Sequence, residues 1–190
     1  KASTLNKLIS FYQNDSLNKS VTYANQALLL IGSINNKELT ADILHNIAIT
    51  YRLTGDTKRA LKYFRAAYWY YSETDNQLKK ADIINNIGIV YRYVGFYDVS
   101  LNYHLKALCI YNSNNYKKGV ISAINNIGVV YRNIGQNDIA RNYYLYALKL
   151  NQSLNNKSEK AITLTNIGNI DWYEGKFNPA LQNYNNALEI

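Results

Sequence analysis

The stretch that decides the fold is Asn85-Asn86-Ile87-Gly88-Ile89-Val90-Tyr91-Arg92, and it returns along the chain at intervals of forty residues. It recurs as Asn125-Asn126-Ile127-Gly128-Val129-Val130-Tyr131-Arg132, and in altered form over residues 45–52 and 165–172. One asparagine keeps this register throughout, at Asn6, Asn46, Asn86, Asn126 and Asn166. Self-similarity at a fixed period indicates a repeat architecture, in which each unit buries its apolar face against its neighbours.

Helical periodicity runs through every copy. Apolar residues spaced by three and four positions predict an amphipathic helix, and residues 41–52 carry them at Leu44, Ile47, Ala48 and Tyr51. Breaks between copies are expected at Asn35-Asn36, Asp75-Asn76, Asn114-Asn115 and Asn155-Asn156, because Asn tolerates the left-handed conformation that ends helices. Five helix pairs are therefore predicted in a single array over residues 1–190, namely 1–40 (degenerate), 41–80, 81–120, 121–160 and 161–190 (truncated).

The copy in residues 121–160 resembles the signature of the tetratricopeptide repeat (TPR), with family-type residues at Ile124, Ile127, Gly128, Tyr131, Gly135, Ala140, Tyr144 and Ala147. The resemblance implies an all-α fold, a right-handed α-solenoid of about five antiparallel helix pairs. The period of forty residues exceeds the usual ~34, so longer helices are expected. This long form is similar to the repeats of kinesin light chain, of polarity scaffolds, and of TPR regions in bacterial sensor kinases and regulators.

In the family that this chain resembles, the first helix of each pair lines a concave groove. The resemblance therefore places Asn46, Asn86, Asn126 and Asn166 in the groove, with Asn85 and Asn125 beside them. Further along the same helices follow Arg52, Arg92, Arg132, Tyr93 and Tyr173. Because similar TPR proteins hold a peptide backbone with groove asparagines, the asparagine row is expected to have that role.

The chemistry of these rows favours an extended, acidic peptide. A carboxamide both donates and accepts hydrogen bonds, so one carboxamide per repeat matches the N–H and C=O groups of a strand laid along the groove. A guanidinium binds a carboxylate through two parallel hydrogen bonds, so the arginine row would select acidic segments. The alternative is that the asparagines bond neighbouring helices and serve packing alone, and that Arg52 pairs with Asp56 four residues further on.

One copy departs from the pattern at Asp171, where the other copies carry an aromatic residue. Two interpretations are open. Asp171 lies at an open end of the array where no neighbour buries it, or it takes part in a polar contact with Trp172 and Tyr173 nearby.

Several classes of function find no support in the sequence. The chain carries no phosphate-binding glycine loop, no Cys/His/carboxylate cluster with metal-ligand spacing and a single cysteine, Cys109, so neither an enzyme nor a cofactor is expected. No signal peptide opens it, and its apolar runs are far shorter than the ~20 residues that cross a bilayer. The net charge of +8 leaves nucleic acid as a less favoured partner, contacted by an edge of lysines at Lys37, Lys79, Lys80, Lys117, Lys118, Lys157 and Lys160.

These observations predict a protein–protein interaction module that binds an extended, acidic peptide or partner segment. It is expected to be the sensor or regulatory part of a larger signalling protein, in the cytoplasm or, in a membrane kinase, outside it. The alternative is a structural scaffold that self-associates through the last helix pair, whose apolar residues Leu181 and Leu188 would have no following repeat to cover them.

Overall fold

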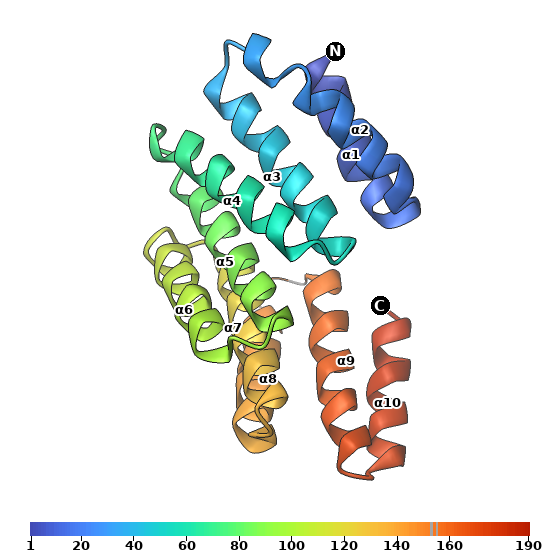
Figure 1. The fold of residues 1–190 in the computed structure, drawn as a ribbon. Coiled ribbons are helices and arrows are strands. Elements are labelled where there is room, and N and C mark those ends of the chain that lie inside the picture. The colour runs from blue at the N-terminus through green and yellow to red at the C-terminus, as the bar shows by residue number, and fades with distance from the viewer. Residues whose placement is uncertain (153, 155) are drawn as a thin grey trace. The chain divides into compact units, whose positions relative to one another are not determined.

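The computed structural model describes residues 1–152, 154 and 156–190, and over these residues the chain is all-helical, with no strand (Figure 1). Ten α-helices form a series of about five antiparallel pairs, as the periodicity predicts. Their bounds are α1 (Ala2–Asp15), α2 (Leu17–Leu28), α3 (Lys37–Leu53), α4 (Thr57–Ser72), α5 (Gln77–Tyr93), α6 (Tyr97–Ser113), α7 (Lys117–Asn133), α8 (Asn137–Gln152), α9 (Lys157–Tyr173) and α10 (Phe177–Leu188), with a short 3-10 helix, η1 (Ile31–Ser33), after α2.

The helices begin and end where the turn residues require it. The side chain of Asn36 accepts a hydrogen bond from the Leu39 N–H at 2.8 Å, and Asp56 accepts one from the Arg59 N–H at 2.8 Å. Such caps satisfy N–H groups that have no partner inside the helix. Asn115 takes the left-handed conformation expected of a helix break, with φ +53°. Asn155, expected to mark the last break, lies outside the described residues.

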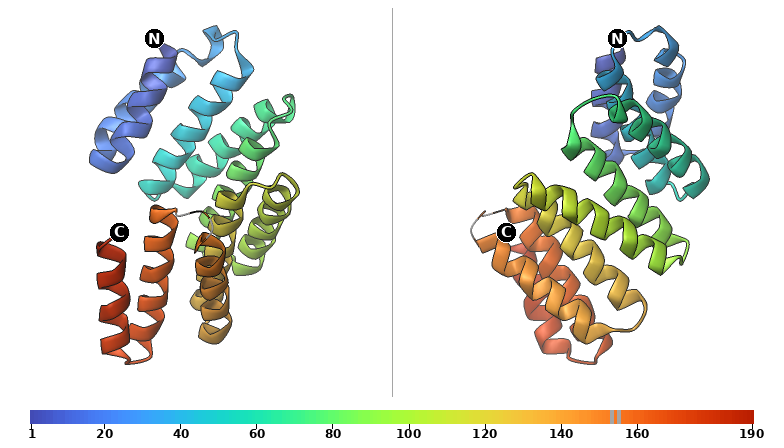
Figure 2. Two further views of the ribbon diagram at one scale, coloured as in Figure 1. Left: turned by 180° about the vertical axis from the view of Figure 1, so that it is seen from behind. Right: turned by 90° about the vertical axis from the view of Figure 1, so that its left-hand side faces the viewer.

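The chain divides into two compact units, residues 1–94 and residues 95–190. In the first unit α1 packs against α2, α3 against α4 and α4 against α5, while α1, α3 and α5 are neighbours along one side. In the second unit α6 packs against α7, α7 against α8, α8 against α9 and α9 against α10, which form an antiparallel pair (Figures 1 and 2). That both units belong to a single solenoid stays a prediction.

The helices are long, with 17 residues in α3, α5, α7 and α9, in agreement with the long period. A glycine inside such a helix costs about 1 kcal/mol relative to alanine, and its packing reason is an aromatic ring. A Cβ on Gly128 would lie 2.5 Å from Cε1 of Tyr144, and one on Gly168 would lie 2.7 Å from Cε1 of Tyr184. The missing side chain makes room for the tyrosine of the paired helix.

In the described part of the chain, none of the helices has the length and hydropathy needed to cross a membrane.

Candidate functional site

The asparagine row of the first unit is half-buried on the side formed by α1, α3 and α5. Nδ2 of Asn46 donates to Oδ1 of Asn6 at 2.8 Å, so this row bonds from helix to helix. Nδ2 of Asn86 donates to the main-chain oxygen of Asp82 at 2.9 Å and lies 3.4 Å from Nε2 of His45. The side-chain oxygens of Asn46 and Asn86 accept no hydrogen bond from any described residue. These carboxamides thus serve packing with their nitrogens and offer their oxygens as acceptors.

In the second unit the row is continued by Asn126 and Asn166, both half-buried, on α7 and α9. The side chain of Asn166 forms no hydrogen bond within the described residues. Both asparagines therefore lie where a partner can reach part of each side chain.

Two residues expected to line a groove are instead buried. Asn85 is 5% exposed and Asn125 is 3% exposed. Nδ2 of Asn125 donates to Oγ1 of Thr163 at 2.9 Å and to Oε2 of Glu159 at 3.1 Å, both on the neighbouring helix α9. A buried carboxamide must find such partners, because it has lost water. Asn125 therefore joins α7 to α9, and a role of Asn85 and Asn125 in peptide binding stays a prediction.

His45 occupies the same repeat position in α3. Burial lowers the pKa of His45 from 6.5 to about 4, with Lys79 lowering it further and Asp42 opposing. The imidazole is thus neutral at pH 7, which suits its contact with Asn86.

Two arginines of the predicted row, Arg52 and Arg92, have no carboxylate partner among the described residues. Arg52 and Arg92 lie in the last turns of α3 and α5, where a cation is favoured by the helix dipole. Nε of each is buried with no hydrogen-bond partner, and no carboxylate among the described residues pairs with either. Burial lowers the pKa of the Arg52 guanidinium, Tyr93 raises it and Arg92 lowers it. The anticipated pair with Asp56 does not form, because the Asp56 carboxylate binds Arg59.

Arg52 and Tyr93 line the same pocket, together with Leu53, Gly55 and Thr57. Its volume is about 370 Å³. The Arg92 guanidinium lies over the Tyr93 ring, 4.5 Å from its centroid, which holds that ring in place at the rim. The ring itself is 61% exposed. The pocket is therefore lined by a guanidinium group, an aromatic ring and a hydroxyl group, from Arg52, Tyr93 and Thr57.

In the second unit the matching positions are dispersed. Arg132 is half-buried in the last turn of α7, with Nη1 buried and without a hydrogen bond. Tyr173 is 76% exposed at the end of α9. Among the pockets described in this unit, none brings these two side chains together.

Asp171 fits neither of its two interpretations. It is 4% exposed, its Oδ1 lies 2.9 Å from Nη2 of Arg141, and its Oδ2 accepts from Nδ2 of Asn183 at 2.9 Å. A buried carboxylate needs such partners. Trp172 instead packs edge-on against Phe177, with ring centroids 5.0 Å apart.

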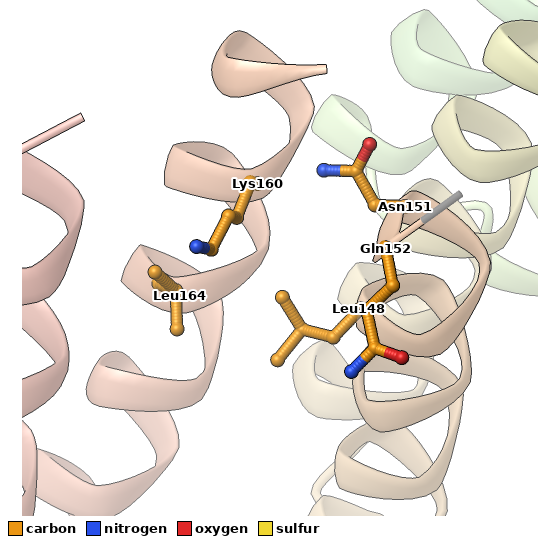
Figure 3. A pocket seen from close by; sticks show the side chains of 5 residues that line it. All are labelled: Leu148, Asn151, Gln152, Lys160 and Leu164. Carbon is orange, nitrogen blue, oxygen red and sulfur yellow. The ribbon is translucent and has the colours of Figure 1, made fainter. Parts of the chain in front are cut away.

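A second pocket lies between α8 and α9 (Figure 3). Leu148, Asn151 and Gln152 come from α8, whereas Lys160 and Leu164 come from α9. Its volume is also about 370 Å³. No sequence pattern had singled out this pocket.

The expected basic edge is partly neutralised. Lys37 pairs with Glu73, and Nζ of Lys79 lies 2.9 Å from Oδ1 of Asp42. Among the described residues, no group of three or more His, Cys, Asp or Glu side chains could hold a metal ion.

Comparison with known proteins identifies the family. A model described as tetratricopeptide repeat matches residues 1–72 and 119–190, and a second model of the same description matches residues 81–113. The chain belongs to the tetratricopeptide repeat family. Repeats of this family generally mediate protein–protein interaction and are typically non-catalytic. No curated protein matches the chain in sequence.

Solved structures share the fold at low identity. A Rap protein in complex with competence and sporulation factor is 15% identical, with a TM-score of 0.86 over 96% of this chain and 51% of its own. The Rap conjugation gene regulator of plasmid pLS20, in complex with the Phr* peptide, is 16% identical, with a TM-score of 0.74 over 100% and 63%. A TPR-like repeat protein of Podospora anserina, described as a kinesin light chain, is 11% identical, with a TM-score of 0.70 over 98% and 92%. The TPR chain thus spans about half the length of the first Rap protein.

Proposed function

We propose that this TPR chain binds an extended, acidic segment of a partner protein or peptide along the side of the first unit formed by α1, α3 and α5. The half-buried asparagines Asn46 and Asn86 would accept hydrogen bonds from the N–H groups of that segment. Arg52 and Arg92 would bind one of its carboxylates, with Tyr93 beside it. The coarse function, protein–protein interaction, is that of the family; the acidic peptide is our proposal.

One observation carries the proposal. Two neighbouring arginines have buried Nε groups without hydrogen bonds and no carboxylate partner among the described residues. Burying part of a charge without a partner is unfavourable, and an external carboxylate would relieve that cost. Two acids of this unit are engaged elsewhere, since Asp42 pairs with Lys79 and Asp56 with Arg59.

Two of the similar structures are complexes. Two Rap proteins were solved with a competence and sporulation factor and with the Phr* peptide, respectively. A peptide ligand for this TPR chain is in keeping with those complexes, although identities of 15% and 16% carry the fold alone. We also propose that the chain is the sensor or regulatory part of a larger signalling protein.

In the second unit, Asn126, Asn166, Arg132 and Tyr173 are proposed as a further set of contacts. Arg132 again has a buried nitrogen without a partner, and Asn166 has an uncommitted carboxamide within the described residues. Asn85 and Asn125 are excluded from the proposal because they are buried.

A structural role is the second candidate. Leu181 and Leu188 on α10 are largely exposed, and Phe177 is exposed near them in sequence. Exposed apolar side chains on one helix favour association with another surface. Self-association through α10 would make the chain a scaffold.

The test begins with a peptide selected from a random phage-displayed dodecamer library on the whole chain. Binding of the synthetic peptide is then measured by calorimetry. Arg52→Gln should weaken binding by about 1.5–3 kcal/mol, the usual contribution of a hydrogen bond to a charged group. Asn46→Ala and Asn86→Ala should each weaken it by about 0.5–1.5 kcal/mol. Asn102→Ala, at an exposed site on α6, is the matched control and should have no effect.

Two results would count against peptide binding. Selected peptides without Asp, Glu or a free carboxylate would remove the acidic preference. A dimer that dissociates on Leu181→Ser with Leu188→Ser, in a chain that selects no peptide at all, would favour the scaffold. Light scattering over a concentration series makes that second measurement.

A further inference from the structure

The pocket between α8 and α9 lies at a repeat position that holds a tyrosine in the two preceding copies. Tyr71, Tyr111 and Asn151 occupy the same place in three successive copies, forty residues apart. Tyr71 and Tyr111 are buried at the ends of α4 and α6. At Asn151 the chain thus has a small side chain where its own pattern has a large one.

The two tyrosines show what that position contacts. The Tyr71 hydroxyl donates to Oδ1 of Asp42 at 2.5 Å, within its own helix pair. The Tyr111 ring packs against Gly119, on the first helix of the following pair. Tyr111 therefore fills space between a second helix and the next first helix. For residue 151 those two helices are α8 and α9.

Asn151 does not reach into this space as a tyrosine would. Its Nδ2 donates to the main-chain oxygen of Asn156 at 2.8 Å, and its Oδ1 accepts from the Asn156 N–H at 3.1 Å. Both the amide nitrogen and the amide oxygen of Asn151 are therefore hydrogen-bonded to the main chain of Asn156. When a large side chain is replaced by a small one, neighbours close the gap only partly, and a cavity remains.

The cavity of about 370 Å³ has walls of two kinds. Leu148 and Leu164 supply apolar surface from opposite helices (Figure 3). Gln152 and Lys160 supply a carboxamide and an ammonium group. The Lys160 side chain forms no ion pair or hydrogen bond within the described part of the chain. An apolar slot with one cation is the composition of a small-molecule site.

We infer that this pocket binds a small aromatic acid, whose ring takes the place of the tyrosine ring and whose carboxylate contacts Lys160. The size allows it, since a cavity of about 150 Å³ already accommodates benzene. The ring lies between Leu148 and Leu164, and the acid group reaches the exposed ammonium. This site belongs to the second unit and is independent of the peptide site proposed on the first.

The experiment uses 4-hydroxyphenylacetate as the probe, measured by calorimetry on the whole chain. Asn151→Tyr restores the residue of the other copies and should lower affinity at least tenfold by filling the pocket. Leu148→Phe narrows the pocket from a second position on α8 and should have the same effect, so the test does not depend on one variant folding. Circular dichroism checks the helix content of both.

The acid group is tested separately. The neutral probe 4-hydroxyphenylacetamide should bind roughly threefold more weakly than the acid, and Lys160→Gln should remove that difference, because an exposed ion pair contributes little. Lys149→Gln, an exposed lysine on α8, is the matched control. Arg52→Gln should leave binding of the probe unchanged.

Two outcomes would overturn the inference. Binding of 4-hydroxyphenylacetate that persists in both Asn151→Tyr and Leu148→Phe would place the probe elsewhere. No binding of either probe to the natural chain at millimolar concentration would show that the pocket is only a packing gap. Failure of the peptide selection with normal probe binding would sink the proposed function and leave this site standing.

Discussion

In the first unit Tyr51 stacks on Tyr63, with ring centroids 5.6 Å apart and planes 18° from parallel. At the matching positions of the second unit, Asp171 accepts a hydrogen bond from Asn183 at 2.9 Å instead. A third position changes with them, because Arg141, which pairs with Asp171 at 2.9 Å, stands where earlier copies have Val21, Leu61 and Leu101. An apolar set of three has been replaced by a polar set of three.

The comparison shows that a repeat position fixes where a side chain lies between the helices, but not whether that side chain is aromatic or charged. Between α2, α3 and α4, ring stacking fills the space around Tyr51. Between α8, α9 and α10, a buried carboxylate fills it and is satisfied by a guanidinium and a carboxamide. Removing one member of a buried ion pair costs far more than replacing the whole set, because the remaining charge is stranded.

Arg141→Leu should cause the largest loss of stability among the changes considered. It leaves Asp171 buried without its cation and removes the contact of Arg141 with Glu174 at 3.0 Å. We expect a loss of about 3–5 kcal/mol in stability, measured by urea unfolding of the whole chain.

The control for this variant is the complete exchange Arg141→Leu, Asp171→Tyr and Asn183→Tyr. It rebuilds in the second unit the set that surrounds Tyr131 and Tyr143, whose rings stack 5.4 Å apart. Stability should return to within about 1 kcal/mol of the natural chain or exceed it. A triple variant no more stable than Arg141→Leu would mean that the helices have adapted to the polar set.

The first unit should be sensitive to mild acid, through His45. Its pKa is lowered to about 4 in the folded chain from 6.5, so above pH 6.5 both folded and unfolded states are neutral there. Below that pH the unfolded chain takes up a proton first, and stability falls as the pH drops towards 4. The whole shift is equivalent to about 3 kcal/mol.

Thermal unfolding from pH 7 to pH 4 measures this dependence. His45→Asn gives α3 the residue that α5 and α7 carry at the matching position, Asn85 and Asn125, and it should flatten the curve between these pH values. An unchanged curve in this variant would assign the acid sensitivity to other groups.

Gly128→Ala tests a smaller difference, that between the pair α7 and α8 and the pair α3 and α4. Its Cβ would lie 2.5 Å from the Tyr144 ring, whereas Ala48 and Phe64 are both buried at the matching positions of α3 and α4. We expect a net loss of about 1–3 kcal/mol, because overcrowding of a packed core outweighs the gain in helix propensity. The reverse change, Ala48→Gly, should cost only about 1 kcal/mol. Equal losses in the two variants would argue against the crowding at Tyr144.

The smallest effect is expected for Asn6→Ala. It removes the acceptor of the 2.8 Å hydrogen bond from Asn46 in a half-buried setting, where water can replace it. The loss should be about 0.5–1.5 kcal/mol, less than that of Asn125→Ala, whose partners Thr163 and Glu159 would lose their bonds in a buried site. Comparing the unfolding midpoints of Asn6→Ala and Asn125→Ala tests which variant loses more stability.

The fold could be predicted from the sequence because its signals repeat. The spacing of Leu44, Ile47, Ala48 and Tyr51 and the turn at Gly55 recur in register, so errors in one copy are corrected by another. A tyrosine ring lies against each of Gly128 and Gly168, which explains why glycine is found inside these helices.

The burial of individual side chains in the proposed site could not be predicted from the sequence, because adjacent residues of one helix face different surroundings. Asn85 and Asn86 are neighbours in sequence, yet one is buried and the other half-buried. The partner of Asp171 could have been found by looking for a second departure from the pattern, and Arg141 is that departure. The pocket between α8 and α9 could have been found in the same way, from Asn151 in place of tyrosine.

The ion pair between α8 and α9 also bears on how such a gene can change. A duplication that replaced residues 161–190 by a second copy of residues 121–150 would put tyrosines at positions 171 and 183. The Arg141 guanidinium would then face rings in place of a carboxylate. Because Arg141 belongs to the preceding pair, the last pair cannot be exchanged for another copy without a change at position 141 as well.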